Sequence, residues 1–286
     1  DPAAIQWGLK LDQTTNATAT ACAVNSLWAI TGNVDNPGGN IIIRNAFDQN
    51  LSYGYGYHLL PPEVQAKRLG AEFPLMSRAG YSSSAHADSV LKAIETGEPY
   101  PIRMVWMTST NPIANMGADA PRLFRALKGV DFVVVNDLFM TPTAIAFADL
   151  VLPAAMSPER NSQRCWWVPN RTLTKVTQYE ECVSDDLVTM VGKRLHPENF
   201  PWDDNIGWIN HIFEHETNDE LPYKSFEEAQ KVVWSYPAFT YLKHEKGLLR
   251  PDGQPGFNTP SGRIELYNTN LMLWGYDPLP DFKEPS

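Results

Sequence analysis

The sequence predicts an α/β protein with a three-layer, Rossmann-like αβα arrangement around a parallel sheet. Three short apolar runs indicate the strands, at residues 102–107, 132–135 and 150–153. Residues 119–128 and 141–147 lie between these runs and have the spacing of helices. The run at 132–135 is rich in valine and does not alternate with polar residues, which is typical of a parallel strand buried on both faces. This order of strands and helices, with short turns, indicates a βαβαβ unit.

The three predicted strands all end in polar or small residues, at 110–111, 136–137 and 153–154. In an open parallel sheet the carboxyl ends of the strands meet at one edge, and ligands bind beyond that edge. We therefore expect Asn111 and Asp137 to lie on the same side of the sheet, beside a cleft that fits a purine nucleotide.

Composition restricts the possible partners. The 286 residues are 43% hydrophobic and 20% charged, which is ordinary for a globular protein. The net charge of −10 repels phosphate backbones and anionic lipid surfaces. No stretch approaches the ~18 consecutive apolar residues of a membrane span. The sequence therefore predicts no nucleic-acid binding and no membrane insertion by this segment.

The three cysteines, Cys22, Cys165 and Cys182, are far apart and form no Cys-x-x-Cys pair. Such spacing indicates neither a disulfide framework nor a zinc or iron–sulfur site. We expect them to be small buried side chains.

Further helices are predicted on both sides of the βαβαβ unit. Residues 17–31 have helical spacing with Asn16 as the candidate N-cap, and residues 33–40 have the chemistry of a tight turn. Residues 44–84 show no lasting period and predict a loop-rich connection. The remaining helices are expected at 86–95, capped by Ser83 or Ser84, and at 185–195, 208–216 and 226–234. In the helix at 185–195, four apolar side chains would face inward: Leu187, Val188, Val191 and Leu195.

The C-terminal part is rich in glycine and proline from residue 248 to residue 267. It predicts an extended segment at 263–267. The last ten residues, 277–286, contain three prolines and predict a linker.

Five stretches of sequence carry a resemblance to a known family. They are Trp7-Gly8 with Asp12-Gln13, residues 27–39, residues 110–112, residues 135–144 with 148–153, and residues 259–267. In this order they resemble the molybdopterin oxidoreductases of the dimethyl sulfoxide reductase family. These enzymes hold molybdenum or tungsten between two molybdopterin guanine dinucleotides. Each stretch alone is weak, whereas five in family order over nearly the whole chain are specific.

The resemblance implies that the chain is a central fragment of a longer polypeptide. Family members supply an iron–sulfur cysteine cluster, or its remnant, and a metal ligand before this region, and a β-rich domain after it. The implied cofactor of the parent enzyme is molybdopterin guanine dinucleotide with molybdenum or tungsten, and a 4Fe-4S cluster is expected only outside this chain. The parent enzyme would perform two-electron redox or oxygen-atom transfer. The isolated chain would be inactive, because it contributes no metal ligand and no catalytic residue.

The same resemblance implies three segments. Residues 1–99 would hold the end of an inserted subdomain and its loop-rich connection, residues 100–195 the half-domain that binds the guanine dinucleotide, and residues 196–286 helices and a linker. The incomplete sheet would expose an edge. Expected partners are the missing N- and C-terminal parts of the polypeptide, with an electron-transfer subunit as a further candidate. The compartment would be the cytoplasm or periplasm of a bacterium or archaeon.

Asp137 is the candidate for guanine recognition, because a carboxylate can accept hydrogen bonds from both N1–H and N2–H₂ of the base. An aspartate that caps the following helix is the alternative. Asn136 belongs to the same polar pair, which the family places against the nucleotide. Asn111 fits an amide contact to the cofactor, with a turn residue before Pro112 as the alternative.

Three more candidate cofactor-binding residues rest on the resemblance alone. Gln13 matches a cofactor-contacting glutamine of the family, although a surface amide would look the same. Arg160 lies where relatives often carry a cation near the phosphates, and a solvated loop arginine is the alternative. Asp185 matches a further nucleotide-side aspartate, but Ser184 or Asp186 aligns nearly as well.

Other interpretations of the chain stay open. The pattern His211-x-x-Glu214-His215 on a helix places two imidazoles on one face and would suit a zinc metallopeptidase with Glu214 as general base. A nicotinamide enzyme is disfavoured, because no Gly-x-Gly-x-x-Gly turn follows a strand. A non-catalytic binding module is the third interpretation.

Overall fold

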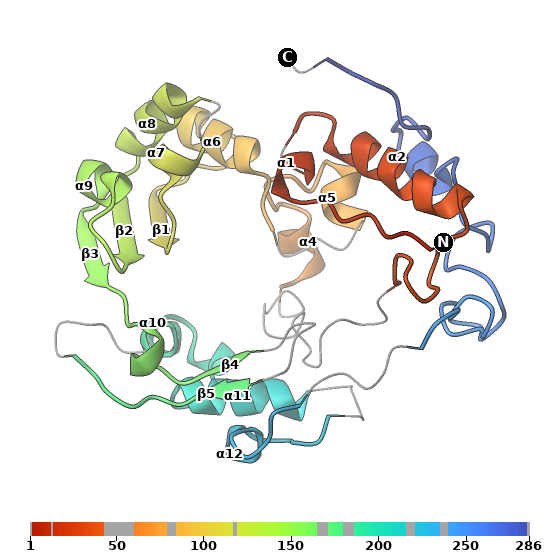
Figure 1. The fold of residues 1–286 in the computed structure, drawn as a ribbon. Helices are drawn as coiled ribbons and strands as arrows, with labels where there is room; N and C mark the ends of the chain where they lie inside the picture. Colours follow the sequence, from red (N-terminus) through yellow and green to blue (C-terminus); the bar gives the residue numbers. More distant parts are fainter. Residues whose placement is uncertain are drawn as a thin grey trace. The chain divides into compact units, whose positions relative to one another are not determined.

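Contacts within the chain divide it into two units, one of which joins the two ends of the sequence. In the computed structural model (Figure 1), unit 1 comprises Asp1–Ala46 with Tyr236–Ser286, and unit 2 comprises Phe47–Ser235. The structure describes residues 2–12, 14–42, 60–78, 84–116, 119–164, 171–179, 186–215, 221–234 and 240–284. No helix in these ranges is long and apolar enough to span a bilayer.

Three parallel strands form the centre of unit 2. The strands β1 (Met104–Thr108), β2 (Phe132–Asp137) and β3 (Leu150–Pro153) pair in the order β1-β2-β3. After β1 come α7 (Pro112–Asn115) and α8 (Ala120–Lys128), and α9 (Pro142–Phe147) connects β2 to β3. The predicted α/β class and its parallel βαβαβ unit are confirmed.

The core of unit 2 lies between one face of this sheet and its helices. Val133 and Val135 are 1% and 0% exposed, and Met107 beside them in β1 is 6% exposed. These side chains share one cluster with buried residues of α6 (Ala87–Thr96), α8 and α9, namely Leu91, Leu123, Ala126, Leu127, Ala144 and Phe147. Alternation along the strands therefore turns every second residue toward the helices.

The other face of the sheet is only partly covered by the residues that the structure describes. Met104, Trp106, Phe132 and Leu150 are 37–49% exposed there, and the register places Met104 beside Phe132 and Trp106 in line with Leu150. Val134, between Trp106 and Leu150, is only 2% exposed. The central strand is thus buried on both faces, as expected, whereas this side of the edge strands β1 and β3 remains accessible.

Side-chain caps fix the starts of α8 and α9. Asp119 accepts a hydrogen bond from the Arg122 backbone N–H at 3.0 Å, and the Thr141 hydroxyl accepts one from the Ala144 N–H at 3.2 Å. Each bond satisfies an N–H that has no partner within the helix, so these turns define where the helices begin.

One expectation about this region is wrong. The N-cap of α6 is His86, whose Nδ1 lies 3.0 Å from Ser89 Oγ, rather than Ser84; Ser83 lies outside the described residues. Phe124 of α8 is 42% exposed. It packs edge-on against Phe147 with ring centroids 5.0 Å apart, so it covers the rim of the core instead of filling it.

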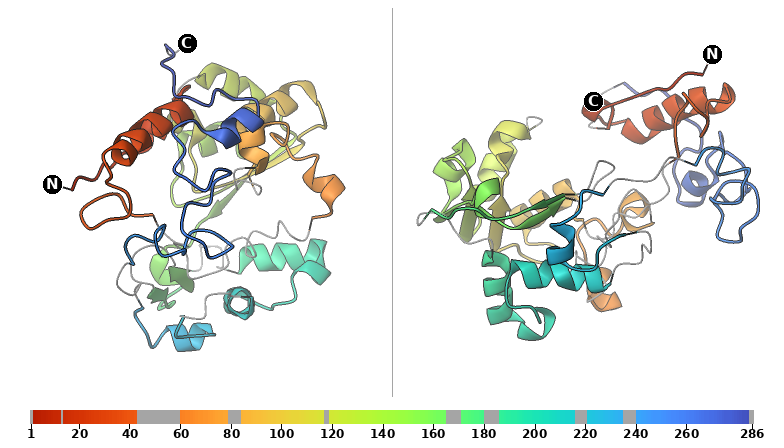
Figure 2. Two further views of the ribbon diagram at one scale, coloured as in Figure 1. Left: turned by 90° about the vertical axis from the view of Figure 1, so that its right-hand side faces the viewer. Right: turned by 60° about the horizontal axis from the view of Figure 1, so that its bottom comes forward.

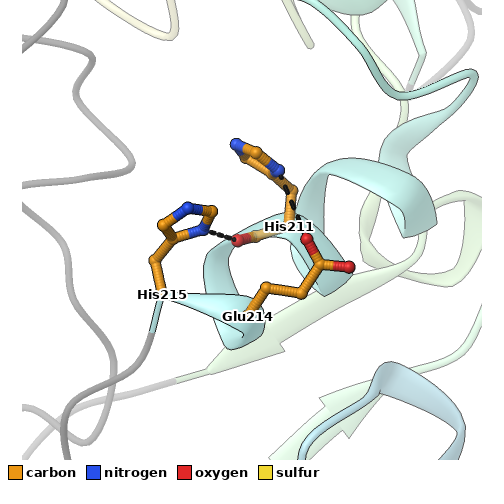
Figure 3. A group of neighbouring side chains, drawn as sticks. All are labelled: His211, Glu214 and His215. Carbon is orange, nitrogen blue, oxygen red and sulfur yellow. Dashed lines mark hydrogen bonds and ion pairs between the residues drawn. The ribbon is translucent and has the colours of Figure 1, made fainter.

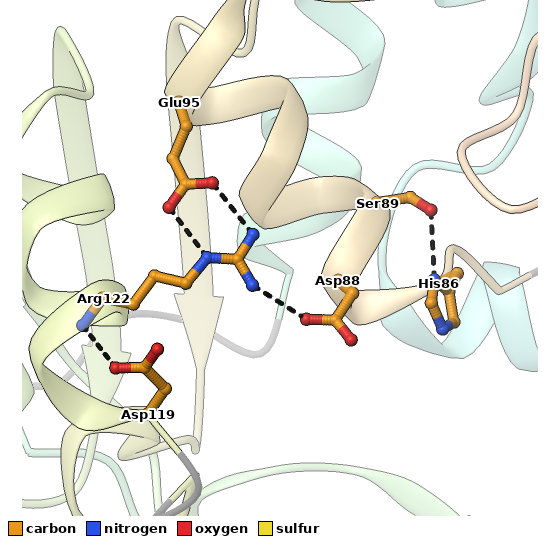
Figure 4. A network of polar contacts seen from close by, with 6 residues as sticks. All are labelled: His86, Asp88, Ser89, Glu95, Asp119 and Arg122. Carbon is orange, nitrogen blue, oxygen red and sulfur yellow. Dashed lines mark hydrogen bonds and ion pairs between the residues drawn. The ribbon is translucent and has the colours of Figure 1, made fainter.

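A salt-bridge network joins α6 to α8 (Figure 4). Arg122 of α8 donates to both carboxylate oxygens of Glu95 at 2.8 and 2.9 Å, and to Asp88 at 3.2 Å. The hydrogen bond from Arg122 is the main cause that holds the pKa of Glu95 below its ordinary value. The network therefore joins, on their exposed side, two of the helices that cover the sheet.

The remaining elements of unit 2 build a second cluster. It contains Ile209 and Phe213 of α11 (Asn205–Glu214), Phe226 and Ala229 of α12 (Phe226–Ala229), and Leu221 and Tyr223 between them. An antiparallel pair, β4 (Ser162–Arg164) and β5 (Arg171–Leu173), belongs to the same part of the chain. The other elements are α4 (Pro62–Gln65), α5 (Pro74–Arg78), η2 (Ser157–Glu159), α10 (Leu187–Leu195) and η3 (Pro197–Asn199).

Helix α10 forms where expected, but of the four side chains expected to face inward only Leu187 and Val191 are half-buried. Val188 and Leu195 are 69% and 68% exposed, whereas Thr189 and Gly192 are buried. The Phe200 ring lies where a side chain at Gly192 would be, since a Cβ there would come within 2.3 Å of it. Phe200, a residue beyond the helix, therefore packs against the buried face of α10. The two later helices also differ from expectation: α11 begins at Asn205 rather than 208, and α12 ends at Ala229 rather than 234.

Unit 1 packs the C-terminal segment beside α2 (Ala17–Ile30), as the red and blue ribbons of Figures 1 and 2 show. The bounds of α2 match the prediction, but Asn16 does not cap it through its side chain. Instead, Asn16 Nδ2 donates to the Asp281 carbonyl at 2.7 Å. The predicted linker is therefore anchored at this point.

The other elements of unit 1 are short helices. They are α1 (Leu9–Asp12) and α13 (Thr269–Leu273). Residues 263–267, expected to be extended, form bends and belong to no strand of the described sheets.

Cys22 is free and half-buried, and burial raises the pKa of its thiol. Cys165 and Cys182 lie outside the described residues.

A buried ion pair holds unit 1 together. Asp35, in the predicted tight turn, is 0% exposed and adopts a φ of 55°, a conformation that aspartate and asparagine tolerate better than most residues. Its carboxylate accepts hydrogen bonds from Lys243 Nζ at 2.5 Å, from the Lys243 N–H at 2.7 Å and from the Ile42 N–H at 3.1 Å. Lys243 is 4% exposed. The pair joins segments 208 residues apart.

Breaking this pair should destabilise unit 1. Asp35→Asn keeps the tolerance for positive φ but leaves the Lys243 ammonium buried without a counter-charge, which costs about 3–5 kcal/mol. Urea denaturation followed by circular dichroism measures the loss. Glu227→Gln, which breaks the exposed pair of Glu227 with Lys231, is the matched control and should leave the midpoint almost unchanged. Equal stabilities of the two variants would show that the buried pair is not what joins the two ends.

The Arg122 network predicts a pH dependence. Because the folded-state pKa of Glu95 is lowered, its contribution to stability is present above the unfolded value of about 4.3 and is lost as the pH falls through the folded value. In Arg122→Met the pKa of Glu95 should return toward its ordinary range, as read from the carboxyl ¹³C shift. The stability difference from wild type should shrink between neutral pH and pH ~3. Arg125→Met, which removes a weaker influence on Glu95, should shift that pKa less.

Candidate functional site

The three strands of unit 2 end together at one edge of the sheet. Thr108, Asn136 and Leu152 are register partners across the three strands. Beyond them, the Ser109 N–H donates to the Asn136 carbonyl at 2.9 Å, and the Ala154 N–H donates to the Asp137 carbonyl at 3.0 Å. The hydrogen-bond ladder thus continues into the loops and fixes their starts. The expectation that the polar strand ends share one edge is confirmed by this register.

Asn111 bridges the loop after β1 to the start of α9. Its Oδ1 accepts a hydrogen bond from the Thr143 hydroxyl at 2.7 Å, and that hydroxyl accepts one from the Ile113 N–H at 3.2 Å. Thr143 is 0% exposed. Asn111 is therefore more than a turn residue before Pro112, since half of its amide holds two loops together. Its Nδ2 makes no hydrogen bond to any described residue.

Asn136 and Asp137 are both half-buried at the end of the central strand. Asn136 Nδ2 donates to the Leu152 carbonyl at 2.9 Å, so this amide tightens the pairing of β2 with β3. Asp137 Oδ1 accepts from the Phe139 N–H at 3.3 Å, a local turn bond. Asp137 does not cap α9, because Thr141 does so. Its Oδ2 has no hydrogen bond to the part of the chain that the structure describes.

Arg160 follows β3 after the short helix η2. Its side chain is exposed and makes no ion pair or hydrogen bond with the described residues. The neighbouring Glu159 is 2% exposed and accepts from the Met156 N–H at 2.8 Å and the Tyr179 N–H at 3.0 Å. Glu159 therefore anchors the loop that carries Arg160. Among the described residues, no hydrogen bond or ion pair joins Arg160 to Asn111, Asn136 or Asp137.

Two predicted site residues, Gln13 and Asp185, lie outside the described residues. The structure also adds residues that the sequence did not single out as site residues. Thr143 is the buried hydroxyl on which Asn111 depends, and Ser109 takes a φ of 50° at the point where β1 leaves the sheet. A serine with positive φ is uncommon and marks the sharp turn into the site. No periodicity or spacing reveals either feature.

Comparison with known proteins identifies the class. Residues 1–163, more than half of the chain, match the molybdopterin oxidoreductase family. The chain belongs to the molybdopterin oxidoreductase family, and its relatives are members of the dimethyl sulfoxide reductase family, as the resemblance predicted. The family is that of molybdopterin oxidoreductases, whose members carry a molybdenum or tungsten pterin cofactor.

Several relatives cover most of this chain. It is 29% identical over 312 residues to acetylene hydratase of Syntrophotalea acetylenica, covering 99% of this chain and 40% of that protein. It is 30% identical over 241 residues to dopamine dehydroxylase of Eggerthella lenta, covering 78% and 23%. The solved structure of acetylene hydratase from Pelobacter acetylenicus matches with a TM-score of 0.76 and 26% identity, covering 99% of this chain and 41% of that one. The chain thus spans between 23% and 41% of the length of these relatives, and none of them is named as a peptidase.

The Asn111–Thr143 link should be needed to hold the strand-end loops. Thr143→Val keeps the size of the side chain but removes its hydroxyl, which leaves the Ile113 N–H without its partner and Asn111 Oδ1 with only the longer bond, 3.4 Å, from the Thr143 N–H. We expect a loss of about 1–3 kcal/mol in the free energy of unfolding. Thr143→Ser, which retains the hydroxyl, is the control. Chemical denaturation compares the two, and a larger loss in the serine variant would mean that the methyl group, not the hydrogen bonds, matters.

Proposed function

We propose that this chain binds the guanosine part of molybdopterin guanine dinucleotide in a molybdenum or tungsten oxidoreductase. The proposal rests on one observation: the half-buried pair Asn136-Asp137 ends the central strand, with the ends of β1 and β3 on either side of it in register. Parallel sheets bind nucleotides at this edge. Family membership supplies the class of cofactor.

The hydrogen-bonding groups at the edge fit the two ends of a guanosine. Asp137 has Oδ2 and a second lone pair on Oδ1 to accept from N1–H and N2–H₂ of guanine. Adenine has an acceptor at N1 and no 2-amino group, so this contact would select guanine over adenine, and hydrogen bonds to a carboxylate are stronger than those between neutral groups. Asn111 Nδ2 is a donor suited to a ribose hydroxyl or a phosphate oxygen, while Oδ1 of the same amide keeps the loop in place.

Arg160 would supply positive charge toward the pyrophosphate, since its guanidinium has no counter-ion among the described residues. Gln13 and Asp185 remain proposed contacts on the strength of the resemblance. When bound, the metal cofactor supplies two-electron redox or oxygen-atom chemistry. The residues of this chain bind and orient its nucleotide end.

The parent enzyme is proposed to include further polypeptide on both sides of this chain, and an electron-transfer subunit is a candidate partner. The accessible apolar face of the sheet, with Met104 and Trp106, is suited to contact that polypeptide. The metal ligand and any 4Fe-4S cluster would lie in that further polypeptide. The isolated chain is therefore expected to bind nucleotide without turning over a substrate.

Nucleotide binding tests the proposal directly. Calorimetry on the 286-residue chain should show tighter binding of GDP than of ADP. Asp137→Asn preserves the acceptor for the Phe139 N–H but replaces one guanine acceptor by a donor, so GDP affinity should fall by roughly 10- to 100-fold, matching the loss of a charged hydrogen bond. Because xanthine carries an oxygen in place of the 2-amino group, the variant should bind XDP better than GDP.

Asp131→Asn is the matched control for this experiment. Asp131 is exposed and precedes β2, at the amino end of the same strand, where it pairs with Arg103 at 2.7 Å. This variant should bind GDP as the wild type does. Equal binding of GDP and ADP, or an unchanged GDP affinity in Asp137→Asn, would remove the basis for guanine recognition at this edge.

A further inference from the structure

A group of potential metal ligands lies at the C-terminal end of α11, in a part of unit 2 separate from the strand ends. His211, Glu214 and His215 each offer one ligand atom, and these atoms all lie within 4.8 Å of one another (Figure 3). Their spacing of three and four residues puts them on one side of the last helical turn. Glu214 Oε2 is already 3.6 Å from His211 Nδ1. Ligands of tetrahedral zinc, with bonds of about 2.0–2.1 Å, are roughly 3.3 Å apart, so small rotations would complete the geometry.

The His215 ring is already oriented by a backbone group. Its Nδ1 lies 2.8 Å from the His211 carbonyl oxygen. Because a carbonyl only accepts hydrogen bonds, Nδ1 carries the proton and the basic lone pair of the neutral ring is on Nε2. A histidine whose second ring nitrogen donates to a carbonyl is the usual arrangement of a metal-ligating imidazole. Figure 3 shows both imidazole rings and the Glu214 carboxylate around the same helix end.

The surroundings favour a cation at this place. The end of a helix carries partial negative charge from its last carbonyl groups, and His215 is the C-cap of α11. Glu214 adds a formal negative charge and is 68% exposed, so a metal ion can enter from solvent. The His211 ring packs against the Trp202 ring, with ring centroids 5.0 Å apart. Packing thus restricts one ligand, a backbone bond orients the second, and the third is exposed, so the packed core does not hold it in one position.

We propose that His211, Glu214 and His215 form a binding site for a divalent transition metal ion, most readily Zn²⁺. Two imidazoles and one carboxylate are a nitrogen and oxygen set that suits zinc and leaves a fourth position for water or another ligand. Glu214 acts as a ligand here, not as the general base of a peptidase. The ion would tie the last turn of α11 to its C-cap, independently of the molybdopterin cofactor and of nucleotide binding.

Metal titration of the chelator-treated 286-residue chain tests the site. Calorimetry with ZnCl₂ should give one ion per chain, and added zinc should raise the melting temperature. His215→Ala and Glu214→Gln should each weaken zinc binding by at least about tenfold, the loss that even an outer-shell substitution can cause. Substitution by Co²⁺ should produce the visible absorption of a four-coordinate ion in wild type only.

His196→Ala is the matched control. His196 Nδ1 lies 3.5 Å from Glu198 Oε1, so it is also a histidine beside a carboxylate, but both side chains are largely exposed and no second imidazole is present in the described surroundings. Zinc affinity should be unchanged in this variant, and circular dichroism establishes that each variant is folded. Absence of one-to-one binding, unchanged affinity in either site variant, or an equal loss in His196→Ala overturns the proposal.

Discussion

Parallel pairing of three strands is the constraint on which the candidate nucleotide site depends. A parallel ladder brings the carboxyl ends of all its strands to one edge, and in unit 2 the ladder continues past the strands through the N–H groups of Ser109 and Ala154. Main-chain hydrogen bonds therefore fix where the loops begin, independently of the side chains. The core on the helix side, around Val133 and Val135, stabilises this pairing by excluding water from one face.

Side chains at this edge divide their hydrogen-bonding capacity between the scaffold and what lies beyond it. Asn111 uses its oxygen to hold Thr143, and Asn136 uses its amide nitrogen to hold β3. An amide carries both a donor and an acceptor, so it can serve a structural bond with one group and a ligand with the other. The structural and functional interpretations of such a residue are therefore compatible. The sequence leaves both interpretations open for Asn111, and one amide group can satisfy both.

Local sequence patterns predicted the positions of the helices and strands better than they predicted the contacts between them. The bounds of α2, α8, α9 and the three strands were predictable to within one or two residues, because caps and apolar runs act over a few positions. The inner face of α10 was not predictable in this way, since the Phe200 ring, from beyond the helix, packs against Gly192. Asp35 with Lys243 and Asn16 with Asp281 could not be predicted either, because those pairs are 208 and 265 residues apart. The shared edge of Asn111 and Asp137 was predictable, since parallel topology alone requires it.

Net charge sets a further limit on how this chain can hold a phosphate-bearing ligand. At −10, long-range attraction toward a pyrophosphate is absent, and the overall field opposes its approach. Binding must then come from short-range donors at fixed positions, whose strength depends on geometry and partial burial more than on salt. Asn111 Nδ2 is such a donor at the strand edge, because the Thr143 hydroxyl holds the oxygen of the same amide in place. In the proposed mode of binding, an anionic cofactor would be held by a fixed donor of this kind and by the exposed Arg160, against the overall charge of the chain.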